Sequence, residues 1–81
     1  SIAMSWLVFS VTDSVIMPHV TIGRGAKITR AIIAENAVIE AGCTIGDAEG
    51  GIAVVGHGSR VPAGANVAPG EQYEEAPEQK A

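Results

Sequence analysis

The sequence predicts an all-β protein, a parallel β-helix with about three coils of hexapeptide repeats. Valine recurs every six residues at Val55, Val61 and Val67, and a small residue lies two positions before each valine. No helix has a period of six, whereas alternation along a short strand places each valine and its small partner on the same side. Turn-forming residues fill the intervals at 56–58 and 62–64. Each hexad is therefore one short strand followed by one corner.

The composition agrees with tightly coiled strands. The chain has one leucine, nine isoleucines, nine valines and thirteen alanines. This composition disfavours amphipathic helices and suits strands whose inward positions alternate β-branched and small residues. Five basic residues against nine acidic ones, with one Trp, one Tyr and one Phe, argue against a nucleic-acid surface. The length of 81 residues fits one small domain.

The sequence also bears on the cellular compartment. No apolar run approaches the roughly 20 residues that a membrane-spanning helix needs, and no stretch reads as an export signal. The chain has one cysteine, Cys43, which excludes an internal disulfide, and its place in a small-residue slot predicts a buried, inert thiol. We therefore expect a cytoplasmic protein without a membrane partner.

The N-terminal residues depart from the repeat. Residues 1–4 resemble the remnant of an expression tag leading into a start methionine, and residues 5–13 are expected to form an irregular first coil. The terminal coil of a solenoid has no neighbour above it. Trp6, Leu7 and Phe9 are therefore candidates for an exposed end that contacts a partner.

Residues 14–69 are expected to form the β-helix. The inward-facing positions recur every six residues, and this six-residue frame shifts once. Ile28 and Ile33 are five residues apart rather than six. If the frame continued unchanged, Glu40 would point unpaired into the core at a cost of several kcal/mol. We therefore predict a one-residue deletion at the Arg30-Ala31 corner. The inward pairs are then Ser14/Ile16, Val20/Ile22, Ala26/Ile28, Ala31/Ile33, Ala37/Ile39, Cys43/Ile45, Ala53/Val55, Ser59/Val61 and Ala65/Val67.

An insertion and a tail complete the chain. Ten residues separate Ile45 from Val55, four more than one hexad, and the surplus is assigned to an acidic, flexible loop at 46–50. Residues 70–81 form an acidic tail. We weigh two states for it, a frayed and solvated segment or one packed through Tyr73 against the last coil or a neighbouring chain.

Two histidines raise the question of catalysis. Hexapeptide-repeat acyltransferases often use a histidine as a base that deprotonates an acceptor. His19 and His57 both fall at expected corners facing solvent, and neither has a nearby carboxylate in the sequence to orient it. We therefore assign no catalytic residue. Two distant corner histidines and one core cysteine also make no metal-ligand set.

Three basic residues are the best candidates for a ligand site. Arg24 and Arg30 occupy equivalent positions in successive hexads, so they project from neighbouring corners with Lys27 between them. Such a group holds a phosphate in many proteins. It equally suits a solvated edge that discourages aggregation.

Residues 14–67 resemble the C-terminal β-helix domain of bacterial glucose-1-phosphate adenylyltransferase, also called ADP-glucose pyrophosphorylase, or its non-catalytic paralogue. The shared features are the SVIMP block at 14–18, the IGRGAKI hexad at 22–28, the turn into a block ending TIGD at 44–47, and the insertion before GIAVVG at 51–56. The resemblance implies that the coil is left-handed. It covers most of the chain.

The resemblance also implies a function. The family's enzyme joins ATP and glucose 1-phosphate into ADP-glucose and pyrophosphate for glycogen synthesis, and ATP and magnesium bind an N-terminal catalytic domain that this chain lacks. The chain alone is thus expected to bind no cofactor and to be inactive. Its expected partners are further copies of itself, the catalytic domain and a sugar-phosphate effector. Some relatives place a basic effector contact just after the block matching 31–34, where this chain has Glu35.

Two other functions stay open at this point. One is a small trimeric hexapeptide-repeat acyltransferase with His57 or His19 as the base. The other is the β-helix domain of a different sugar-nucleotide transferase.

Overall fold

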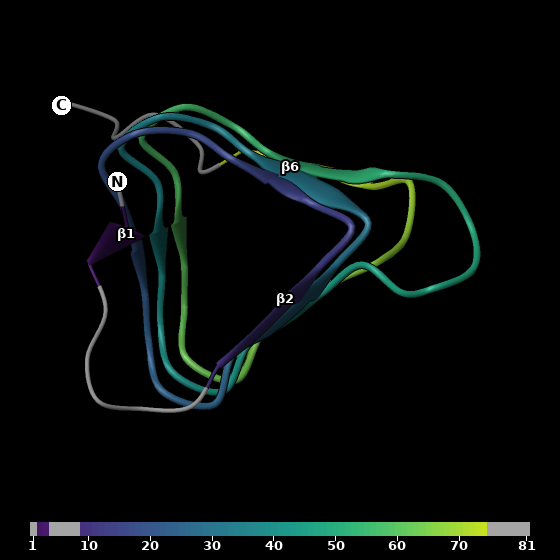
Figure 1. The fold of residues 1–81 in the computed structure, drawn as a ribbon, viewed down its shortest axis with the longest axis horizontal. Coiled ribbons are helices and arrows are strands. Elements are labelled where there is room, and N and C mark those ends of the chain that lie inside the picture. The colour runs from purple at the N-terminus through teal and green to yellow at the C-terminus, as the bar shows by residue number, and fades with distance from the viewer. Residues whose placement is uncertain (1, 4–8, 75–81) are drawn as a thin grey trace, which may run out of the picture.

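The computed structural model describes residues 2–3 and 9–74, which form twelve short strands wound into a triangular prism (Figure 1). The strands are β1 (Ile2–Ala3), β2 (Ser10–Thr12), β3 (Val15–Ile16), β4 (Val20–Ile22), β5 (Lys27–Thr29), β6 (Ala31–Ile33), β7 (Val38–Ile39), β8 (Thr44–Ile45), β9 (Ala53–Val55), β10 (Arg60–Val61), β11 (Asn66–Val67) and β12 (Gln72–Tyr73). No helix long and apolar enough to cross a membrane occurs among the described residues.

Three parallel sheets form the sides of the prism. Sheet A has the order β1-β4-β7-β10, sheet B the order β11-β8-β5-β2, and sheet C the order β12-β9-β6-β3. Each strand pairs with the third strand after it, so one coil contributes one strand to every sheet. In Figure 1 the chain turns counter-clockwise as it recedes from the viewer, which is the sense of a left-handed coil. The fold is therefore the left-handed parallel β-helix that the sequence predicts.

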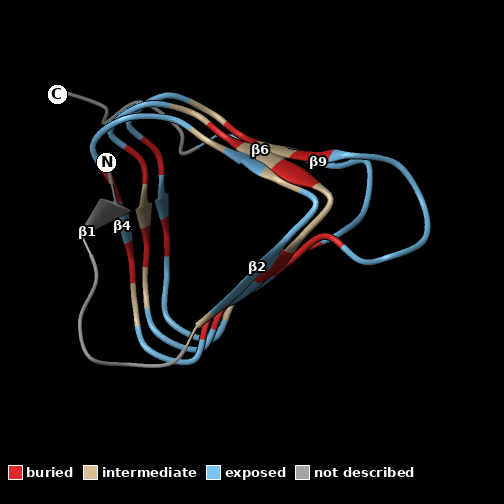
Figure 2. Ribbon diagram, in the orientation of Figure 1, coloured by how far each residue is buried: buried red, intermediate tan, exposed pale blue. Residues whose placement is uncertain are grey.

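The core is a column of side chains along the inside of the prism (Figure 2). The inward pairs from Val20/Ile22 to Ala65/Val67 are buried, apart from Ala65, which is half-buried. The first pair, Ser14/Ile16 at the N-terminal end, is half-buried as well. In most of these pairs a small residue comes two positions before a β-branched one, and on β4 Val20 takes the place of the small residue. This alternation suits a narrow interior, where large and small side chains pack together.

The strand register reveals the slip and the insertion. Ile2 pairs with Val20 and Val55 with Tyr73, both 18 positions along, which is one coil of three hexads. Ile22 instead pairs with Ile39, 17 positions along. Ile33 pairs with Val55, 22 positions along. Val11 also pairs with Ile28, 17 positions along, so the corner between Val11 and Ile16 is short by one residue as well as the predicted corner at Arg30-Ala31. The coil that follows has four extra residues, as the frame of the sequence predicts.

The corners require residues in the left-handed backbone region. Gly58 has a φ of 69°, and the matching corners of the two preceding coils are occupied by Asn36 with a φ of 66° and His19 with a φ of 64°. Asparagine and histidine are enriched among non-glycine residues in this region. The position of His19 is thus explained by the geometry of a corner.

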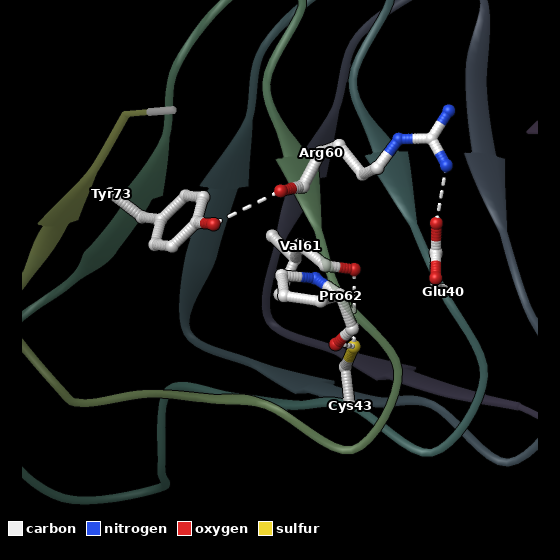
Figure 3. Close-up of polar contacts among 6 residues, drawn as sticks. All are labelled: Glu40, Cys43, Arg60, Val61, Pro62 and Tyr73. Atoms are coloured by element: carbon white, nitrogen blue, oxygen red, sulfur yellow. Dashed lines mark hydrogen bonds and ion pairs between the residues drawn. The ribbon is translucent and has the colours of Figure 1, made fainter. Parts of the chain in front are cut away.

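The two ends of the coil are closed to different degrees. Val11 of β2 pairs with buried Ile28 but is 37% exposed, because β2 is the edge strand of sheet B. Phe9 is half-buried against the core, while Trp6 and Leu7 lie outside the described residues. At the other end, Tyr73 of β12 packs against the core, and its hydroxyl donates to the carbonyl oxygen of Arg60 at 3.0 Å (Figure 3).

The Tyr73 contact yields a testable prediction. Tyr73→Phe removes one hydrogen bond and keeps the packing of the ring, so we expect the free energy of unfolding to fall by about 1 kcal/mol. Tyr73→Ala also removes the packing over the last coil and should cost at least about twice as much. Urea unfolding followed by circular dichroism measures both. Equal losses for the two variants would contradict the contribution assigned to the ring.

Candidate functional site

The inserted loop projects from the prism at the corner between sheets B and C (Figure 1). A groove lies at the same corner. The loop spans residues 46–52, between β8 and β9. The groove has a volume of about 440 Å³, and we call it the corner groove. Its lining residues are Asp13, Val15, Arg30, Ala31, Ile32, Ala48 and Ile52.

Arg30 connects the coil to the inserted loop. Its backbone has a φ of 50°, its N–H donates to the Thr12 carbonyl at 3.0 Å, and its carbonyl accepts from the Ala53 N–H at 3.1 Å. One terminal nitrogen of the guanidinium donates to the Ala48 carbonyl at 3.3 Å. The side chain therefore holds the loop beside the groove, with its charge at the groove's edge.

The other two predicted basic residues lie elsewhere. Lys27 points outward from β5 on sheet B and lines a separate hollow with Phe9. Arg24 is exposed at the corner between sheets A and B. The three residues follow one side of the prism from corner to corner, as expected, and Arg30 alone of the three lines the corner groove. Their contact with an effector stays a prediction.

The histidines lie at the corner between sheets C and A. His57 is exposed, and its Nε2 lies 3.4 Å from Nδ2 of Asn36. His19 is exposed at the equivalent corner of the first coil. Within residues 2–3 and 9–74, no three His, Cys, Asp or Glu side chains are grouped so as to hold a metal ion.

Cys43 is a core residue, as predicted. Its side chain is fully buried, and Sγ donates to the Pro62 carbonyl at 3.0 Å (Figure 3). The thiol thus fills the small-residue slot of its hexad and links two adjacent coils.

A comparison with protein families shows to which family the chain belongs. Residues 7–51 match the model of the GlmU-like, C-terminal hexapeptide family, and this match covers more than half of the chain. The chain belongs to this family. No curated protein and no solved structure matches it. Membership of this family supports a hexapeptide-repeat β-helix domain of nucleotidyltransferase type. The match does not by itself distinguish an adenylyltransferase from related enzymes.

The GlmU-like, C-terminal hexapeptide match ends at Gly51, and the same fold continues through β9 to β12. Sequence reasoning did not identify the corner groove. One sequence feature could have indicated the groove. Val15 and Ile32 are apolar although they lie outside the inward pairs, at outward positions of β3 and β6.

Proposed function

We propose that this chain is the C-terminal β-helix domain of a glucose-1-phosphate adenylyltransferase or of its non-catalytic paralogue, and that it serves assembly and regulation. One observation carries the proposal: the corner short by one residue at Arg30-Ala31 and the coil long by four match the slip and insertion of the enzymes that the sequence resembles. The family match supports the coarser assignment to a nucleotidyltransferase-type β-helix domain.

The chemistry of the proposed enzyme belongs to its catalytic domain. In that domain ATP, with magnesium, would react with glucose 1-phosphate to give ADP-glucose and pyrophosphate. This chain contributes a stiff prism, since every internal strand of each sheet is hydrogen-bonded on both sides. Such a body positions subunits and transmits contacts between them. Arg24, Lys27 and Arg30 are the residues proposed to contact a sugar-phosphate effector, and the cytoplasm is the proposed compartment.

An activity assay tests the proposal. The product of the complete gene should release pyrophosphate from ATP only when glucose 1-phosphate is present, or, for the non-catalytic paralogue, should do so when combined with its catalytic partner. The 81-residue chain alone should release none. A complete gene product that uses a different sugar phosphate would instead assign the domain to another sugar-nucleotide transferase.

The contact of His57 with Asn36 supports a second candidate, a hexapeptide-repeat acyltransferase. Asn36 orients the imidazole at an exposed corner, where a base would meet an acceptor hydroxyl or amine. The test is acyl transfer from acetyl-coenzyme A to a sugar or amine acceptor. Transfer that is lost in His57→Ala and kept in His19→Ala would favour this candidate over the adenylyltransferase.

A further inference from the structure

Two side chains of opposite charge line the corner groove. Thr12 pairs with Thr29, so Asp13 and Arg30 follow at matching positions of adjacent coils. Both residues have a φ of 50°, so their corners turn in a similar way. Among the described residues, no hydrogen bond or ion pair involves the Asp13 carboxylate. The groove therefore presents a negative and a positive group that do not neutralise each other.

Arg30 keeps donors for a ligand. A guanidinium carries five N–H donors. One terminal nitrogen donates to the Ala48 carbonyl at 3.3 Å, and this contact holds the half-buried side chain beside the groove. The planar fork of a guanidinium matches the two oxygens of a carboxylate. Arg30 is thus suited to bind a carboxylate while it stays attached to the inserted loop.

The other large side chains of the groove are apolar. Val15 of β3, Ile32 of β6 and Ile52 of the inserted loop line it. Val15 is 56% exposed and Ile52 is 50% exposed, so a ligand that covers them removes apolar surface from water. The volume of about 440 Å³ is in the range of small-molecule sites. The groove therefore suits a small molecule that has an apolar body and two opposite charges.

We propose that the corner groove binds a free α-amino acid with an apolar side chain. The α-carboxylate accepts hydrogen bonds from the Arg30 guanidinium, and the α-ammonium donates to the Asp13 carboxylate. The side chain of the ligand lies against the apolar residues of the groove. Both charged groups of an α-amino acid are attached to one carbon atom, so one ligand reaches two coils that are about 4.8 Å apart.

Asp13 disfavours a sugar phosphate inside the groove. A phosphate group carries up to about two negative charges, and binding at Arg30 would bring it close to the Asp13 carboxylate on the adjacent coil. Like charges at this separation repel, which selects against such a ligand. An α-amino acid instead offers its ammonium group to Asp13. The inference therefore goes beyond the function proposed above and concerns a ligand of another class.

Titration of the isotope-labelled 81-residue chain with L-leucine, followed by NMR of the backbone amides, tests the proposal. We expect saturation with a dissociation constant of about 0.1–1 mM, because a ligand of few atoms binds an open site weakly. The amides of Ile32, Ala48 and Ile52 should shift, since these residues line the groove. Glycine has the same charges and no side chain, and should bind at least about tenfold more weakly. No saturable shift in the groove, or equal binding of glycine, would overturn the proposal.

Two variants and two leucine analogues test the charged contacts one at a time. Isocaproate keeps the carboxylate and lacks the amine, whereas leucinamide keeps the amine and lacks the carboxylate. Arg30→Gln should weaken L-leucine and isocaproate at least about fivefold and should not weaken leucinamide. Asp13→Asn should weaken L-leucine and leucinamide by a similar factor and should not weaken isocaproate. Equal effects of a variant on both analogues would overturn the assigned contacts.

The matched controls are Arg24→Gln and Glu35→Gln, since both residues are exposed at other corners of the prism. Both controls should bind L-leucine as the unmodified chain does. Asp13→Asn decides the matter if Arg30→Gln fails to fold, because it removes no hydrogen bond or ion pair among the described residues. Tighter binding of glucose 1-phosphate than of L-leucine in the groove would overturn the proposal. The adenylyltransferase assay uses the complete gene product, so its result is independent of these titrations.

Discussion

Gly46→Ala is expected to lower the free energy of unfolding by at least about 3 kcal/mol. Gly46 is buried at the end of β8 with a φ of +74°, which an L-residue adopts at a cost of about 1–2 kcal/mol. A Cβ at this position would also overlap the carbonyl oxygen of Thr29 and lie 3.2 Å from the Thr29 carbonyl carbon. Because both atoms belong to the backbone, they cannot move aside cheaply. Urea unfolding measures the loss.

The matched control for Gly46→Ala is Gly58→Ala. Gly58 has a φ of +69°, but a Cβ there would meet no atom within 4 Å. This variant bears the backbone cost alone, about 1–2 kcal/mol. Similar losses in the two variants would show that the coils do not approach each other at Gly46 as described.

Ile39→Ala is expected to cost about 2–5 kcal/mol, because it opens a cavity in the central column of the prism. Ile39 is fully buried on β7 and pairs with Ile22 on one side and Val61 on the other. Coils on both sides fix the surrounding side chains, so the cavity has little room to collapse. Chemical denaturation gives the difference in free energy of unfolding.

Val38→Ala provides the comparison within the same strand. Val38 points outward and is half-buried, so its truncation should cost about 1 kcal/mol or less. If Val38→Ala destabilised the protein more than Ile39→Ala, the strand would face the opposite way. The pair thus tests the inward frame after the slip at Arg30-Ala31.

The sequence was sufficient to predict the frame of the β-helix, because a charged residue and a six-residue period constrain it strongly. Glu40 had to face outward, and this required the slip that the pairing of Ile22 with Ile39 displays. The ten residues between Ile45 and Val55 likewise required a loop. Handedness came from the family resemblance, since a period of six is compatible with either hand.

The corner groove depends on contacts that the period does not encode. Asp13 and Arg30 lie 17 positions apart and meet only because the coil returns to the same corner. Arg30 also contacts the Ala48 carbonyl of the inserted loop, and the six-residue period does not predict this contact. The course of the tail was also left open by the sequence, and pairing of β12 with β9 fixes it as far as Tyr73.

The sequence of the gene upstream of the codon for Met4 tests the central assignment most directly. The proposed function predicts an in-frame nucleotidyltransferase domain there, with a glycine-rich phosphate-binding loop or, in the paralogue, its altered counterpart. A stop codon in frame just before that codon, or an unrelated domain upstream, would contradict the assignment of this β-helix to an adenylyltransferase.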